Sequence, residues 1–198
     1  MILRIAVCGI DGSGKSTLIE KLLTLFEQDN IVASYARVPF PSKEAFFKIE
    51  FPIYGIEQEI VKRTGMAFDF VRYYTSFKAT DGILLCDRYD MDYEVLNDVY
   101  CLPEIYLETL HLIYNQAPTI DLYIYLRIDA SLAGNRLNKR GNRKDDENDK
   151  ILNAMQQVFE EHIQHRSNVL ILDAARTSDS NAYFVKKKIL DLWENKND

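Results

Sequence analysis

The segment from Gly9 to Ser16 constrains this chain more than any other part of it. It reads GIDGSGKS and fits the phosphate-binding pattern GxxxxGK[ST] in full. An apolar run leads into it and an amphipathic stretch leads out, which indicates a turn between a strand and a helix. Glycines at such a turn let successive backbone N–H groups point at phosphate oxygens, and the helix that follows directs its positive end at the same charge. The segment therefore predicts a binding site for a nucleoside triphosphate.

The side chains of this loop have expected parts in binding the triphosphate and a magnesium ion. Lys15 is placed to bridge the β- and γ-phosphates, and the hydroxyl of Ser16 is placed to hold the metal, with Thr17 beside it. The other loop residues that we expect to bind the nucleotide are Gly9, Asp11, Gly12, Ser13 and Gly14.

Five short apolar runs predict the strands of one parallel sheet. They are Leu3–Val7, Ala33–Val38, Gly82–Cys86, Leu122–Ile128 and Val169–Leu172. Most are continuous rather than alternating, which indicates strands covered on both faces. Amphipathic stretches predict helices from Ser16 to about Gln28, from Asp149 to about His165, and from Tyr183 to Trp193. The 198 residues are therefore expected to form one α/β domain.

Two segments interrupt this alternation of strands and helices. Phe40–Phe77 is rich in aromatic residues, and we expect several helices in it. Leu137–Lys150 is densely charged with both signs and contains Gly141, which is typical of a mobile loop rather than a core element. We expect this segment, about residues 137–150, to act as a lid.

The bulk composition narrows the classes of partner. The formal net charge of −6 disfavours general nucleic-acid binding. No apolar stretch approaches the ~20 residues needed to cross a membrane, and the start of the chain lacks a signal-peptide pattern. The three cysteines lack CxxC spacing, which disfavours a zinc site or a disulfide framework. We therefore expect a cytoplasmic protein whose partner is a small molecule.

The phosphate-binding pattern alone does not separate kinases from switches and motors. A GTPase-type switch should carry an NKxD motif to read guanine. Residues 138–141 read NKRG, so Gly141 stands where that motif needs a carboxylate. A motor ATPase normally needs more chain than 198 residues for its partner domains. These considerations favour a kinase that uses ATP and Mg²⁺.

Several short motifs, taken in order, resemble the thymidylate kinases and their nucleoside monophosphate kinase relatives. The loop has the form GxDGxGKST with Asp11 inside it, Arg37–Pro39 matches Arg-x-Pro, and Asp87–Tyr89 matches Asp-Arg-Tyr. The resemblance runs over essentially the whole chain as spaced motifs. It implies a three-layer P-loop fold with a parallel five-stranded sheet of order 2-3-1-4-5. It also implies ATP-dependent conversion of dTMP to dTDP, by a protein that is commonly a homodimer.

The resemblance implies roles for a residue of the P-loop and for residues at the ends of two strands. Asp11 would face the 3′-hydroxyl of the acceptor sugar. Arg37 and Arg88 would hold the acceptor's phosphate, for which the planar fork of an arginine is suited. Asp87 would lie near the magnesium ion, at the carboxyl end of a strand beside the loop, where α/β sheets build their sites.

The resemblance also implies a subsite for the base of the acceptor. The spacing F-x-x-x-R places Phe68 and Arg72 on one face of a helix. In the family this pair stacks on the base and hydrogen-bonds its edge.

The charged segment is similar to the lid of these kinases. Arg136 would pack on the adenine of ATP, and Arg140 and Arg143 would close over the transferring phosphoryl group. Ala175 lies in a stretch that resembles the family's backbone contact with adenine. The residues that we expect to act in catalysis are Lys15, Asp87, Arg88, Arg140 and Arg143.

The acceptor side departs from the family's pattern. Asp92 stands where the family has a serine, and the loop after Pro39 lacks the usual pair of glycines. A further carboxylate beside an anionic acceptor is unfavourable because like charges repel. The acceptor therefore stays open between dTMP, another nucleotide and a small metabolite of similar shape. A nucleotide-binding switch without catalysis is the alternative from another class.

Overall fold

The computed structural model describes residues 1–39, 55–77, 81–141 and 147–197. Arg143 and residues 40–54, a stretch for which the sequence predicts helices, lie outside these ranges. Within the described part of the chain no helix is long and apolar enough to cross a membrane.

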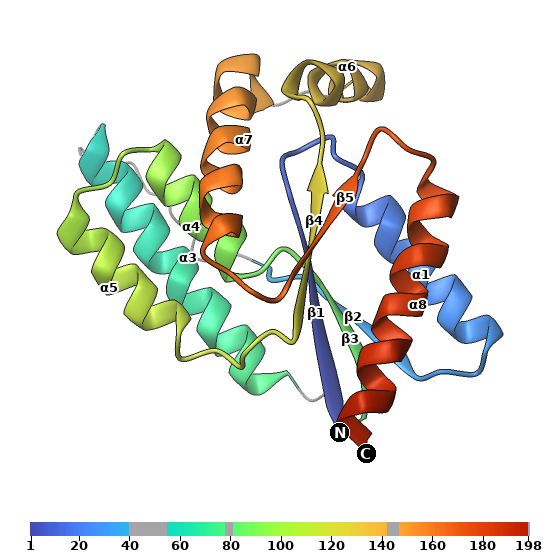
Figure 1. Ribbon diagram of the computed structural model, residues 1–198. Helices are drawn as coiled ribbons and strands as arrows, with labels where there is room; N and C mark the ends of the chain where they lie inside the picture. The colour runs from blue at the N-terminus through green and yellow to red at the C-terminus, as the bar shows by residue number, and fades with distance from the viewer. Residues whose placement is uncertain (40–54, 78–80, 142–146, 198) are drawn as a thin grey trace.

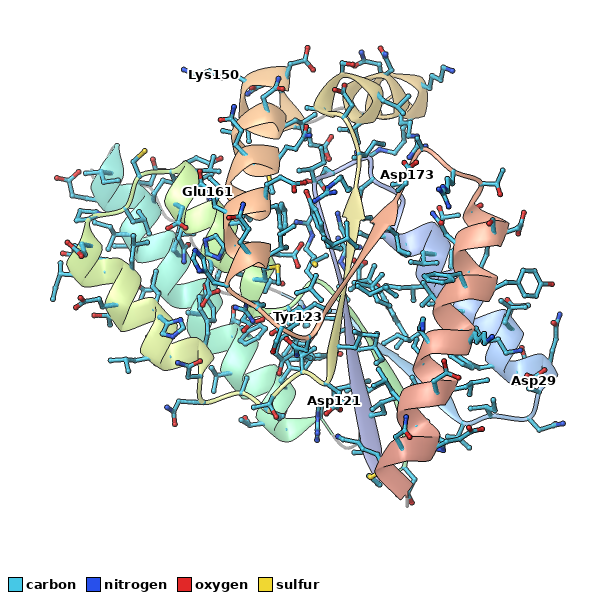
Figure 2. All side chains as sticks on the ribbon, in the orientation of Figure 1. Asp29, Asp121, Tyr123, Lys150, Glu161 and Asp173 are labelled. Atoms are coloured by element: carbon cyan, nitrogen blue, oxygen red, sulfur yellow. The ribbon has the colours of Figure 1, made fainter. Side chains whose placement is uncertain are left out.

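Five parallel strands form one sheet. They are β1 (Ile2–Cys8), β2 (Ala33–Ala36), β3 (Gly82–Asp87), β4 (Leu122–Arg127) and β5 (Val169–Asp173). Their order in the sheet is β2-β3-β1-β4-β5, which confirms the order expected from the sequence. The register pairs Val7 with Asp87, so the P-loop and the end of β3 emerge side by side. In Figure 2, Asp121 marks the amino ends of the strands and Asp173 marks their carboxyl ends.

Seven helices are described around the sheet. They are α1 (Lys15–Gln28), α3 (Ile56–Ser76), α4 (Asp90–Val99), α5 (Glu104–Tyr114), α6 (Ala130–Arg140), α7 (Asp149–Gln164) and α8 (Ser178–Asn197). Helices α1 and α8 cover one face, and α3, α4, α5 and α7 cover the other (Figure 1). Helix α6 crosses above the carboxyl ends of the strands, where the P-loop also lies (Figure 1). The result is the expected three-layer α/β arrangement.

The core fixes the turn that follows β3. The sheet is dry at its centre, where Ile5, Val7 and Leu85 have no exposed surface. Phe70 of α3 is also fully buried and meets other rings edge to face. These rings belong to Tyr74, Tyr89, Tyr93 and Tyr114. Edge-to-face pairs add to the burial of the rings, so this cluster holds the start of α4 against α3.

Several boundaries differ from those expected. Residues 56–76 form one long helix, and α4 and α5 occupy a stretch for which the sequence analysis names no element. The segment expected as a lid loop begins inside α6, which ends at Gly141 with a left-handed φ of 81°. The same segment ends inside α7 at Asp149 and Lys150. The many charged residues of this segment therefore belong in part to the solvent-exposed ends of two helices. Residues 142–146 lie outside the described ranges.

Candidate functional site

The P-loop forms a tight turn between β1 and α1. Gly12 has a left-handed φ of 83°, and a Cβ at this position would lie 2.6 Å from the backbone oxygen of Ala133 in α6. Only glycine fits there, because a side chain would push the loop away from α6. The turn opens into a cleft of about 920 Å³ at the carboxyl edge of the sheet.

Two side chains inside the P-loop are placed for an anion. Lys15 is buried, and its Nζ donates to the backbone oxygens of Gly9 at 2.7 Å and Ile10 at 2.9 Å. Burial, together with the nearby charge of Arg88, lowers the pKa of Lys15. The Oγ of Ser13 is buried and has no hydrogen-bond partner in the described part of the chain. A buried hydroxyl without a partner is unfavourable unless a ligand supplies one, and a phosphate oxygen fits that need.

The carboxylate of Asp87, at the end of β3, contacts two hydroxyl groups and one guanidinium group. One of its oxygens accepts from the Oγ of Ser16 at 3.4 Å and from the hydroxyl of Tyr35 at 3.2 Å. The Nη1 of Arg37 lies 3.5 Å from the same oxygen. The Asp87 side chain is only 2% exposed. The pair of Ser16 and Asp87 fits Mg²⁺, which takes hydroxyl and carboxylate oxygens together with phosphate oxygens and water.

Tyr35 is a site residue that the sequence analysis missed. It lies on β2, and its hydroxyl fixes the carboxylate that the Asp-Arg-Tyr motif supplies. Partial burial, together with the charge of Asp87, raises the pKa of Tyr35. Tyr35 and Arg37 are two positions apart in sequence, and the two-residue period of a strand places both side chains on one side of the sheet. This spacing could have identified Tyr35 as a site residue.

Arg88 and Asp11, which both line the cleft, form an ion pair. Lys15 stands 3.8 Å from the same carboxylate, so Asp11 lies between two cations. Burial opposes the charge of Arg88, but Asp11 and Asp92 outweigh it and raise the pKa of Arg88. Arg88 has a left-handed φ of 71°, a conformation that a residue with a side chain adopts only under constraint. The structure brings Asp11 and Arg88 together, and the sequence analysis had given each a contact with the acceptor.

The far end of the cleft is built from α3 and α4. Arg63 of α3 is 3% exposed, and its Nε lies 3.2 Å from the carboxylate of Glu59. Its guanidinium lies 4.5 Å from the centre of the Tyr100 ring, a favourable cation–π contact. The other residues of these two helices that line this end are Lys62, Met66, Tyr93 and Leu96.

The expected placement of Phe68 and Arg72 at the base is not what the structure shows. Phe68 is 60% exposed, and Arg72 forms an ion pair with Asp69 of the same helix at 3.2 Å. Both line a separate cavity of about 410 Å³ between α3 and α5. Their spacing does place them on one face of α3, but that face points away from the cleft. The apolar repeat of Met66, Phe70 and Tyr74 marks the inner face, and following it would have led to Arg63.

The basic residues of α6 contact the P-loop, the turn after β5 and a residue just before α7. Arg136 donates from Nη2 to the backbone oxygen of Ala174 at 2.9 Å, and its Nη1 lies 3.4 Å from the backbone oxygen of Gly12. Arg140 donates to both carboxylate oxygens of Glu147 at 2.9 Å. Ala175 follows Ala174 in the same turn. Its N–H donates a hydrogen bond to the side chain of Asp173 at 2.9 Å. The expected contacts of these residues with adenine stay predictions.

The cleft is strongly cationic although the chain as a whole is acidic. The cations that line it in the described ranges are Lys15, Arg37, Lys62, Arg63, Arg88, Arg136, Arg140 and Arg176. The carboxylates that line it there are Asp11, Asp87 and Glu147. This excess of positive charge suits ligands that carry several phosphates.

Asp92 lies behind the P-loop rather than in the cleft. It has no exposed surface and is not among the described residues that line the cleft. Its oxygens accept from the backbone N–H groups of Gly9 at 3.4 Å and Tyr89 at 3.2 Å. Burial raises its pKa to about 6. The structure therefore places this carboxylate outside the lining of the cleft, so it does not stand beside an anion that binds there.

Comparison with known proteins finds similarity in structure, whereas the comparisons of sequence find none. No protein-family model matches this chain, and no curated protein matches it. The fold is similar to that of the deoxyadenosine kinase from M. mycoides, solved with its products dCMP and a flexible dCDP bound. The TM-score is 0.71, and the match covers 96% of this chain and 100% of that one at 17% sequence identity. The likeness confirms the P-loop α/β fold.

Proposed function

We propose that this chain is a kinase that transfers the terminal phosphoryl group of ATP, bound with Mg²⁺, to a nucleotide-like acceptor. The observation that supports it is the meeting of two sets of groups in one cleft. The P-loop supplies Lys15 and Ser16 at one side. The ends of β2 and β3 supply Arg37, Asp87 and Arg88 beside them. Such an arrangement suits phosphoryl transfer, which needs positioning and charge stabilisation more than covalent chemistry.

In the proposed reaction an acceptor oxygen attacks the γ-phosphorus as the bond to the β,γ-bridging oxygen breaks, and ADP leaves. Lys15 exchanges its two backbone acceptors for phosphate oxygens and stabilises the charge that develops on them. Ser16 and Asp87 would hold Mg²⁺, which would neutralise phosphate charge. Arg37 and Arg88 orient the acceptor's phosphate. Arg136 and Arg140 keep the donor half of the cleft electropositive.

We propose a nucleoside monophosphate as the acceptor, with dTMP as the first candidate. Its support is the resemblance of the Asp-Arg-Tyr and Arg-x-Pro motifs, together with two arginines placed for a phosphate that the acceptor already carries. A deoxynucleoside is the second candidate, because the structurally similar protein is a deoxyadenosine kinase. A protein that only binds nucleotide is the alternative from another class. We further propose that the protein works in the cytoplasm, and the resemblance suggests a homodimer.

An acceptor panel separates these proposals. ATP and Mg²⁺ are supplied with dTMP, with the other nucleoside monophosphates, with deoxynucleosides, or with no acceptor, and ADP release is measured. We expect dTMP to stimulate ADP release most, and Lys15→Ala to abolish the stimulation while Lys187→Ala, an exposed lysine of α8, retains it. Stimulation by deoxynucleosides alone would move the acceptor to the second candidate. ATP binding without stimulation by any acceptor would overturn the kinase proposal.

A further inference from the structure

Asp92 forms a bridge between two segments of the site that are far apart in sequence. One oxygen accepts from the N–H of Gly9, the first residue of the P-loop, and the other accepts from the N–H of Tyr89. Tyr89 directly follows Arg88, whose left-handed φ of 71° turns its side chain toward Asp11. The carboxylate therefore spans from the phosphate cradle to the turn that aims Arg88.

Helix capping explains only half of this arrangement. Asp92 is the third residue of α4, and an acidic side chain there commonly accepts from the N–H of the preceding cap residue, here Tyr89. Capping does not require a second acceptor that reaches another segment, and it does not require complete burial. A serine or an asparagine would cap the helix without placing a buried negative charge behind the P-loop.

The charges around Asp92 connect it to the same two segments. Lys15 and Arg88 both favour its ionised form, against the burial that raises its pKa to about 6. Asp92 in turn helps to raise the pKa of Arg88 and opposes the lowering of the pKa of Lys15. The titratable and charged groups that face it are Lys15 from α1, Arg88 from the turn after β3, Tyr93 from α4 and Cys8 from β1.

We propose that Asp92 is a positioning residue for phosphoryl transfer, which acts by locking the turn of Arg88 to the first residue of the P-loop. The inference rests on the proposed kinase function and deepens it. The two oxygens accept N–H groups most strongly when the carboxyl is ionised, because protonation makes one oxygen a donor and weakens it as an acceptor. The lock therefore holds above about pH 6 and loosens below it.

A double-mutant cycle tests the proposal through activity. Asp92→Asn keeps one acceptor and loses the charge, and we expect kcat to fall by about tenfold to a hundredfold, as for small displacements of a reacting group. If Asp92 acts through Arg88, the same change should alter the activity of Arg88→Ala by less than about twofold. Asp98→Asn, the same change on a partly exposed residue of α4, should leave activity unaltered. Multiplicative losses in the double variant, or an Asp92→Asn variant as active as the original, would refute the lock.

An NMR titration tests the proposal without turnover. We expect the amide signals of Gly9 and Tyr89 to shift together with a midpoint near pH 6. Both shifts should vanish in Asp92→Asn. Independent midpoints, or a shift of Tyr89 alone, would reduce Asp92 to a helix cap and overturn the proposal. A chain that phosphorylates no acceptor but shows the paired titration would refute the proposed function while leaving the lock in place.

Discussion

The buried carboxyl of Asp92 should make the stability of this protein depend on pH in a defined direction. Its pKa is about 6 in the folded chain, against an ordinary value of 3.8. Between these two values the folded state binds more protons than the unfolded state. Stability from this group is therefore fully present below about pH 3.8, and it is lost as the pH rises through 6. Burial is the dominant cause, so the folded protein holds the ionised form at a cost.

The size of the effect follows from the two pKa values. Each unit of difference corresponds to 1.36 kcal/mol, so the change from 3.8 to about 6 corresponds to about 3 kcal/mol over the full range. Of this, about 2 kcal/mol falls between pH 4.5 and pH 7. An asparagine at this position does not titrate. The free energy of unfolding of Asp92→Asn should therefore rise relative to that of the original protein by about 2 kcal/mol between these two pH values.

Urea unfolding at pH 4.5 and pH 7 measures this difference. The constant penalty for the hydrogen bond that asparagine cannot accept is the same at both pH values, so it cancels. Asp191→Asn serves as the control, because Asp191 is an exposed residue of α8 and is not the partner of a histidine in the described part of the chain. A difference between Asp92→Asn and the original protein that is constant with pH, or that shrinks as the pH rises, would refute the burial argument.

Other predictions address the cleft directly. Lys15→Ala should lower ADP release in the presence of acceptor by at least about a thousandfold, with an unchanged or higher Tm because a buried ammonium is removed. Arg37→Ala should raise the acceptor KM by about tenfold or more and the ATP KM far less; equal effects would remove Arg37 from the acceptor site. Gly12→Ala would place a Cβ 2.6 Å from a backbone oxygen of α6, so calorimetry should show at least about tenfold weaker ATP binding. Arg63→Met should change the acceptor KM by about tenfold, whereas Arg72→Met should not; the reverse result would restore the sequence-based assignment.

The sheet and the shape of the P-loop were readable from the sequence because local chemistry fixes them. A P-loop needs its glycines and its lysine in a set order, and continuous apolar runs indicate strands buried on both faces. The expectations for Lys15 and Ser16 follow from this pattern, and that for Asp87 follows from the resemblance of its Asp-Arg-Tyr motif at the end of an apolar run. Their meeting in one cleft is a consequence of the parallel register of β1 and β3.

The lining that α3 and α4 give to the cleft was not readable, because tertiary packing decides it. Phe68 and Arg72 share a face of α3, but nothing in their spacing tells which face the sheet will cover. Arg63 and Tyr100 meet only when α3 packs beside α4. The sequence analysis expected the carboxylate of Asp92 beside the acceptor. In the structure this carboxylate accepts from the N–H of Gly9, which is 83 residues away in sequence. Such contacts depend on how helices are stacked, which motif spacing does not encode.

The close approach of Gly12 to α6 has a mechanical consequence. The loop backbone touches the helix at Ala133, and Arg136 of the same helix reaches toward the loop oxygens and the turn after β5. The first turn of α6 therefore packs directly against the backbone of the P-loop. A movement of this first turn would therefore also move the P-loop. The other end of α6 carries no such contact with the P-loop among the described residues, so a movement of α6 should be larger at the end that Gly141 caps.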